Sequence, residues 1–178
     1  MALRKAGAYS KKYARPYTRK SKVKSKSYIK TIPNSKIVKF RMGDIEGFQK
    51  NKFPIILNIK SREKIQIRDN SIEAARQFLN RHLVDNLGKD FYFEVKIYPH
   101  HILRENKMLT GAGSDRMQTG MAHSFGKTIG RAALVKQNQI LFIIAVKTQK
   151  GELDARKMIS SIKSRLPCSV LVEKIQEE

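Results

Sequence analysis

Residues 140–146 read Ile-Leu-Phe-Ile-Ile-Ala-Val, the longest uninterrupted apolar run in the chain. Seven residues suit one β-strand and fall far short of the roughly 20 that a membrane-spanning helix needs. Because both faces of such a strand are apolar, the run predicts a buried strand at the centre of a sheet. The preceding residues, Lys136–Gln139, are predicted to be the turn of a hairpin that joins this strand to one at Arg131–Val135.

Two helices are predicted by apolar residues spaced three or four apart. The later helix covers residues 153–166, and its apolar face and its end are formed by Ala155, Ile159, Ile162, Leu166 and Pro167. The earlier helix begins at Asn70 or Ser71, with Glu73 in position for a capping box, and it ends at Gly88. Its apolar face is formed by Ile72, Ala75, Leu79 and Leu83.

Further strands are predicted where β-branched or alternating residues gather. These segments are Lys36–Arg41, Ile55–Lys60, Ile65–Arg68, Phe91–Tyr98 and Ser169–Ile175. Along the chain, strands are followed by a helix and a strand, and the same order then repeats without any repeat of sequence. This order predicts a single α+β domain over residues 36–175.

The chain is strongly basic, and its charge is concentrated at one end. Its 178 residues contain 37 Lys and Arg against 15 Asp and Glu, a net charge of +22. Fourteen of the basic residues precede Asp44, which is the first acid, and the remaining residues carry 23 basic against 15 acidic groups. Because a block of like charges repels itself, residues 1–35 are predicted to be an extended arm that binds nucleic acid. A mitochondrial transit peptide and a merely solvated tail have similar compositions.

Aromatic residues among the cations favour the nucleic-acid interpretation of the arm. Four of the six tyrosines lie in the first 28 residues. Tyrosine stacks on unpaired bases, while Lys and Arg neutralise phosphates. The arm residues predicted to bind are Arg4, Lys5, Lys11, Lys12, Arg15, Tyr17, Arg19, Lys20, Lys22, Lys24 and Lys26.

A glycine-rich stretch from Tyr98 to Gly130 lacks apolar periodicity and is predicted to be a long irregular segment. Five of the ten glycines lie between Gly111 and Gly130. Long loops in small domains are usually functional or disordered, and glycine lets a ligand approach the main chain closely. The nearby residues that can bond phosphate, ribose or base edges are Arg104, Lys107, Arg116, Gln118, Thr119, His123 and Lys127.

Neither the motifs in this stretch nor the single cysteine of the chain support a catalytic or metal site. Gly126-Lys127-Thr128 imitates the end of a P-loop, but Met121 stands where that motif needs glycine. His100 and His101 are adjacent, so in a strand they would point to opposite faces. Cys168 is the single cysteine and is predicted to be a small buried apolar residue. We therefore expect no catalytic residue, metal or cofactor; a nucleotide-dependent enzyme and a free nucleic-acid-binding or chromatin-associated protein are the alternatives.

Three segments carry a resemblance to a known family. They are residues 15–20 (Arg-Pro-Tyr-Thr-Arg-Lys), 98–108 (Tyr-Pro-His-His-Ile-Leu-Arg-Glu-Asn-Lys-Met) and 111–121 (Gly-Ala-Gly-Ser-Asp-Arg-Met-Gln-Thr-Gly-Met). Together they resemble the large-subunit ribosomal protein family universal L-sixteen, in the archaeal and eukaryotic branch long called L-ten-e. The resemblance extends from the arm to about Leu171.

The resemblance implies a mixed-sheet domain of the α/β-hammerhead type and a structural role in the large ribosomal subunit of the cytoplasm. It implies that the arm binds large-subunit rRNA, that neighbouring ribosomal proteins are partners, and that no membrane or small-molecule substrate is involved. It also implies that residues 103–127 project toward the peptidyl-transferase centre and the aminoacyl and peptidyl tRNA sites. The residues near tRNA would be Arg104, Lys107, Gly111, Gly113, Arg116, Gln118, Thr119, His123 and Lys127, with Arg116 the foremost candidate for a phosphate contact.

Overall fold

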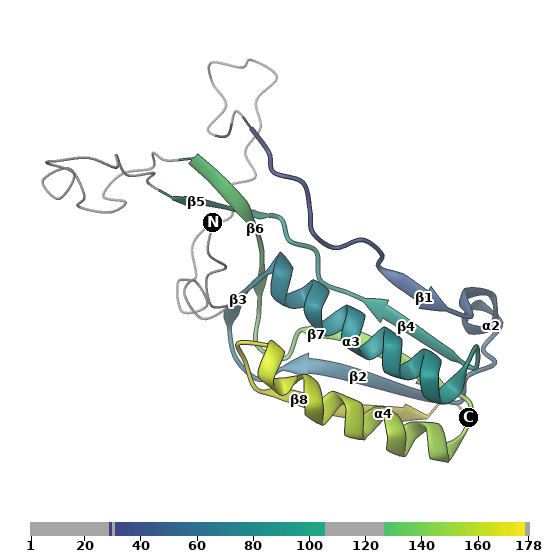
Figure 1. The fold of residues 1–178 in the computed structure, drawn as a ribbon. Helices are drawn as coiled ribbons and strands as arrows, with labels where there is room; N and C mark the ends of the chain where they lie inside the picture. The colour runs from purple at the N-terminus through teal and green to yellow at the C-terminus, as the bar shows by residue number, and fades with distance from the viewer. Residues whose placement is uncertain (1–28, 30, 106–126, 177–178) are drawn as a thin grey trace, which may run out of the picture.

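The computed structural model describes residue 29 and residues 31–105 and 127–176 (Figure 1). Over these residues the chain forms two antiparallel sheets and three α-helices, which confirms the predicted α+β class. The strands are β1 (Arg41–Gly43), β2 (Ile55–Ser61), β3 (Ile65–Arg68), β4 (Phe91–Val95), β5 (His101–Glu105), β6 (Lys127–Val135), β7 (Ile140–Val146) and β8 (Val170–Gln176). The helices are α2 (Ile45–Gln49), α3 (Asp69–Leu87) and α4 (Gln149–Ile162), and a 3-10 turn, η3 (Lys163–Arg165), follows α4.

The larger sheet has five strands in the order β1-β4-β7-β2-β8. Its middle strand, β7, is the apolar run quoted above, so the prediction of a central buried strand is confirmed. Ile144 of β7 lies opposite Phe93 of β4 on one side and Leu57 of β2 on the other, and all three side chains are fully buried. A strand with neighbours on both sides and burial on both faces must be apolar throughout, which is why β7 lacks the alternation of an edge strand.

The main core lies between this sheet and the two long helices. Figure 1 shows α3 and α4 side by side on one face of the sheet. The predicted apolar faces are all buried: Ile72, Ala75, Leu79 and Leu83 from α3, and Ala155, Ile159, Ile162 and Leu166 from α4 and the residues after it. Each buried Leu or Ile contributes about 1.5–3 kcal/mol relative to exposure. None of the helices within the described ranges is long and apolar enough to cross a membrane.

The predicted capping box at the start of α3 is wrong. The N-cap residue is Arg68, whose side chain makes no capping hydrogen bond. Glu73 instead accepts from the buried Arg76, with the Nε atom 2.8 Å from Oε2 and the Nη2 atom 2.6 Å from Oε1. A buried guanidinium left without a carboxylate costs more free energy than a helix end left without a side-chain cap. The predicted end at Gly88 is confirmed: its φ is 62° and its N–H donates to the Val84 carbonyl.

The strand predicted at Lys36–Arg41 is wrong except for its last residue. Residues 36–40 are irregular, and β1 begins at Arg41. The reason is that two main-chain N–H groups of this segment bond to side chains of α3, and a third bonds to Ser35 Oγ, rather than to a neighbouring strand. The Lys36 N–H lies 3.3 Å from Asp69 Oδ2, and the Val38 N–H lies 3.4 Å from Glu73 Oε2. We call residues 31–40 the N-terminal segment.

The predicted hairpin between β6 and β7 is wrong as a strand pairing, although its turn is present. The Gln139 N–H donates to the Lys136 carbonyl, but β6 pairs with β3 and β5 in a separate three-stranded sheet. Ser61, at the end of β2, separates the two strands: its N–H donates to the Gln139 carbonyl, and its own carbonyl accepts from Asn138. The chain therefore passes from one sheet to the other twice at this corner, once after β2 and once before β7.

Candidate nucleic-acid interface

Strands β5 and β6 form an antiparallel ribbon that extends away from the two long helices (Figure 1). His101 lies opposite Ala132 near the body, and Glu105 lies opposite Lys127 at the other end. The irregular stretch predicted from Tyr98 to Gly130 is therefore wrong at both ends, where these strands lie. Five-residue β5 is too short for its alternation to be recognised in sequence, and its pairing with β6 joins residues more than twenty positions apart.

The structure brings together two of the predicted loop residues. Arg104, opposite Thr128, and Lys127, opposite Glu105, both lie at the far end of the ribbon, where Arg104 is half-buried and Lys127 is exposed. The other predicted loop residues lie outside the described residues: Lys107, Gly111, Gly113, Arg116, Gln118, Thr119 and His123. So do all eleven arm residues: Arg4, Lys5, Lys11, Lys12, Arg15, Tyr17, Arg19, Lys20, Lys22, Lys24 and Lys26.

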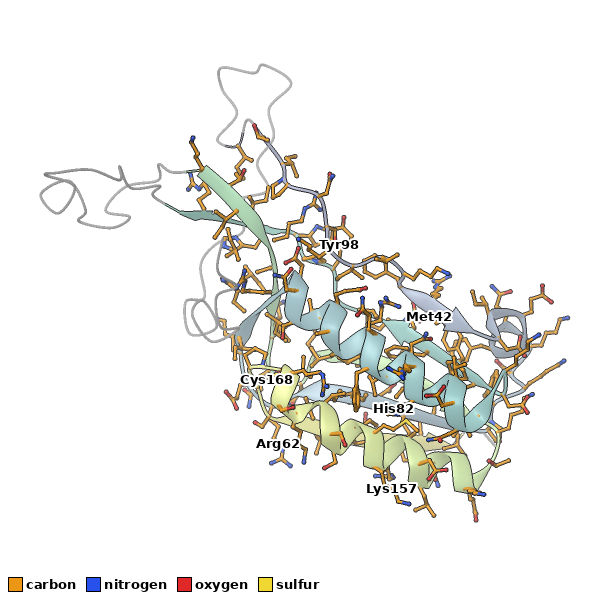
Figure 2. The ribbon with its side chains drawn as sticks, in the orientation of Figure 1. Met42, Arg62, His82, Tyr98, Lys157 and Cys168 are labelled. Carbon is orange, nitrogen blue, oxygen red and sulfur yellow. The ribbon has the colours of Figure 1, made fainter. Side chains whose placement is uncertain are left out.

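An aromatic and cationic cluster lies where the ribbon meets the larger sheet. We call it the Tyr98 cluster, and its members are Phe40, Tyr98, His100 and Arg131. The Tyr98 ring stacks on Phe40 at a centroid distance of 5.6 Å and lies 4.5 Å from the His100 ring. Its hydroxyl accepts from Arg131 Nη1 at 3.1 Å. Figure 2 shows Tyr98 beside the N-terminal segment. Such a grouping of rings and a guanidinium is typical of surfaces that contact RNA.

Sequence reasoning missed the Tyr98 cluster as a unit because its members come from three segments. Phe40 precedes β1, Tyr98 and His100 lie between β4 and β5, and Arg131 lies within β6. Two local signals were available: an arginine in the apolar strand Arg131–Val135, and a tyrosine and two histidines on either side of Pro99. Neither signal shows that the groups meet.

Arg131 also fixes where the basic arm joins the body. Its Nε atom donates to the Pro33 carbonyl at 2.6 Å, and Arg131 lies opposite Ile102 in the ribbon. Ile29, the first described residue, is buried. Pro33, in the predicted arm, is therefore bonded to the same ribbon that ends at Glu105 and Lys127, on either side of residues 106–126.

One buried acid of the larger sheet, Glu94, is neutralised by its neighbours. Glu94 of β4 contacts Lys96 Nζ at 2.9 Å, Arg41 Nε at 3.2 Å and the Tyr92 hydroxyl at 3.0 Å. Burial acts to raise the pKa of Glu94, but the hydrogen bonds from Lys96, Tyr92 and Arg41 outweigh it and leave the pKa below its usual value. Burial and the bond to Glu94 raise the pKa of Tyr92 to about 12. Glu94 is thus ionised and paired, and it adds little repulsion toward a polyanion.

His101 and His100 point in different directions, as the sequence indicated: His101 is buried and His100 is exposed. Among the described residues, no group of three or more His, Cys, Asp or Glu could hold a metal ion. Cys168 is buried, as predicted, and burial raises the pKa of its thiol.

Acid should destabilise the fold through His101. Burial, and secondarily the charge of Arg104, lower the pKa of His101 below its ordinary 6.5 in the folded chain. The unfolded chain then binds this proton more readily, so the free energy of unfolding should fall as pH drops below about 6.5. Urea unfolding at pH 7, 6 and 5 measures the free energy of unfolding, and the variant His101→Gln should show a weaker dependence of this free energy on pH. Equal slopes for the two proteins would contradict the assignment.

Comparison with known proteins identifies the family. A family model described as "Ribosomal protein L16p/L10e" matches residues 13–172. The chain belongs to this ribosomal protein family. It is 37% identical over 180 residues to the large ribosomal subunit protein uL16 of Methanococcus maripaludis strain S2, with 99% of this chain and 98% of the relative covered. It is 39% identical over 168 residues to that of Staphylothermus marinus (94% and 90% covered) and 37% identical over 179 residues to that of Thermoplasma volcanium (99% and 96% covered). The resemblance inferred from the three motifs is confirmed.

Proposed function

We propose that this chain is anchored in large-subunit rRNA by its basic arm, residues 1–35, and holds residues 103–127 beside tRNA near the peptidyl-transferase centre. Membership of the family makes the chain a structural, non-enzymatic constituent of the large ribosomal subunit, located in the cytoplasmic ribosome. Its partners are then rRNA and neighbouring ribosomal proteins. The fold type that we propose is the α/β-hammerhead, supported by a five-stranded sheet with two helices on one face and a separate ribbon.

The observation that carries the tRNA proposal is the register of the ribbon. Residues 106–126 begin and end at Glu105 and Lys127, which lie opposite each other at the end farthest from the body. Twenty-one residues attached at one point, with a cation on each strand beside it, suit contact with RNA outside the body. The bond from Arg131 to Pro33 supports an arm that enters RNA from the same ribbon.

The tRNA proposal predicts that the arm is needed for incorporation into the subunit and that the loop is needed for tRNA binding. Replacing Arg116 with alanine should leave incorporation into large subunits near normal and weaken aminoacyl-tRNA binding about 10- to 100-fold, the usual range for a lost charge-assisted hydrogen bond. Binding of aminoacyl-tRNA to purified ribosomes measures the effect. Arg81→Ala is the matched control, since Arg81 is an arginine of α3 whose side chain is 83% exposed. Loss of incorporation alone, with normal tRNA binding in the ribosomes that form, would contradict the proposal.

A further inference from the structure

A hollow of about 270 Å³ lies in the angle between β6 and the chain that connects β4 to β5. Its floor and rim are formed by Ile97, His101, Ala133, Tyr98, His100 and Gln139. The floor is apolar apart from His101, whose lowered pKa keeps the imidazole neutral at physiological pH. The rim carries two rings of the Tyr98 cluster, one amide and Lys96. The hollow is thus apolar inside and polar at its edge, as small-ligand sites are.

We propose that this hollow receives the base of one unpaired nucleotide of large-subunit RNA, with His100 and Tyr98 as its stacking wall. The inference rests on the proposed rRNA-binding function and adds one specific contact to it. The volume lies below the roughly 300 Å³ at which sites for whole small molecules begin. It therefore suits one planar base whose ribose and phosphate remain outside.

The stacking wall is fixed in position before any ligand arrives. Tyr98 is 42% exposed, yet Arg131 binds its hydroxyl and Phe40 stacks on its ring with an interplanar angle of 23°. The His100 ring lies against the same ring, and the main-chain N–H of His100 donates to the Tyr98 main-chain carbonyl at 3.0 Å. Because these rings are already ordered, stacking a base on them costs little additional conformational entropy.

The rim also supplies a donor for a base edge. Gln139 Oε1 accepts from the Lys136 N–H at 2.8 Å, which fixes the orientation of the amide. Its NH₂ group keeps two hydrogens that can be donated to base oxygens or ring nitrogens. Unpaired bases are recognised in this way, by stacking combined with hydrogen bonds to their edges.

Charge at the rim favours a base over an acidic or basic peptide. Lys96 lines the hollow, but its Nζ atom lies 2.9 Å from Glu94 Oε2, so its charge is largely compensated. A peptide of either charge would therefore gain or lose little from Lys96. A base is neutral, so the contact should depend on stacking and only weakly on salt.

The test uses the full chain and large-subunit particles stripped of this protein. The double variant Tyr98→Leu/His100→Ala should rebind about 5- to 100-fold more weakly, the range for loss of one stacked base. The log–log slope of affinity against salt should stay unchanged because no phosphate contact is removed. Chemical probing should show one unpaired nucleotide that is protected by the unaltered chain and exposed with the variant. His82→Ala is the matched control, since His82 is a half-buried histidine of α3 that packs on Phe78, and it should rebind normally.

Three results would overturn the inference. Normal rebinding of the double variant would show that the hollow holds no base. A weaker salt slope would show that these residues act on phosphates. Protection of the hollow by a neighbouring protein, with no change at any nucleotide, would show a protein contact instead. If the unaltered chain itself failed to rebind the RNA particles, the proposed rRNA-binding function would fail first, and the two failures are thereby distinguished.

Discussion

Replacing Glu73 with leucine should lower the free energy of unfolding by about 3–5 kcal/mol, because it leaves the guanidinium of Arg76 buried without its carboxylate. The side chains of Arg76 and Glu73 are only 9% and 11% exposed, and they share two hydrogen bonds of 2.8 and 2.6 Å. Burial acts to raise the pKa of Glu73, but the bonds from Arg76 and Gln77 outweigh it and leave the pKa below its usual value. The Glu73 carboxylate is therefore charged in the folded chain, and both of its oxygens accept hydrogen bonds.

Loss of the Glu73 carboxylate should also detach the N-terminal segment from α3. Glu73 accepts from the Val38 N–H, and Arg76 Nη1 lies 3.1 Å from the Met42 sulfur. One ion pair thus connects α3 to the chain that leads from the arm to β1. A domain of this size is stable by only about 5–15 kcal/mol, so the change removes a large share of the total. Urea unfolding followed by circular dichroism measures it.

The matched control is the double variant Glu73→Leu/Arg76→Met. With both charges removed and side chains of similar length in their place, most of the lost stability should return, since apolar replacements of buried ion pairs are often neutral. The comparison separates an uncompensated charge from a simple packing defect. Equal destabilisation in the single and double variants would show that packing, and not the unpaired guanidinium, causes the loss.

Deleting residues 1–28 should have the largest effect on RNA binding. The deleted segment contains ten Lys or Arg and no acid. If about eight cations contact phosphates, the log–log slope of affinity against salt is roughly −7 on a duplex estimate. The full chain should then bind large-subunit RNA about 10³- to 10⁵-fold more weakly at 200 mM than at 50 mM salt, and the truncated chain should lose most of this dependence. Filter binding at a series of salt concentrations measures both slopes.

A chain with the same 28 residues in shuffled order is the control for the deletion. It keeps the charge and the tyrosines, so it should keep the salt slope even if it loses affinity through misplaced contacts. Unfolding measurements on both variants verify that the body is intact. An unchanged slope after deletion would show that the arm does not bind the RNA backbone.

Elements that depend on neighbouring residues could be predicted from the sequence. The apolar faces of α3 and α4 recur every three or four residues, and β7 is apolar over its whole length, so each was identified correctly. The errors in the strands occur where a hydrogen-bond partner is distant in the chain. Residues 36–40 have strand-like side chains, but the N–H groups of Lys36 and Val38 bond to Asp69 and Glu73 of α3. The turn before β7 was predicted correctly. Its residues Asn138 and Gln139 form main-chain hydrogen bonds with Ser61 of β2, however, and β6 lies in a different sheet from β7.

Some parts of the candidate site could likewise be predicted from the sequence, and others could not. Charge and glycine content pointed to the arm and to residues 103–127, because a local excess of cations or glycine is visible in the residue order alone. The Tyr98 cluster and the hollow beside it could not be found, since the pairing of β5 with β6 brings Arg131 to Tyr98, 33 residues earlier.

The sequence by itself determined the α+β class, the central strand, the buried faces of the helices, the nucleic-acid partner and, through three motifs, the family. Apart from the family, which the resemblance of the motifs supplied, these properties follow from composition and short-range periodicity, which local chemistry dictates. Only the tertiary structure decided which strands share a sheet, that Glu73 pairs with Arg76 rather than capping α3, and that Pro33 is bonded to the ribbon formed by β5 and β6. Those outcomes depend on tertiary packing, which pairs distant strands and buries polar groups. A buried polar group then takes whichever partner lies within reach, even one as near in the chain as Arg76 is to Glu73.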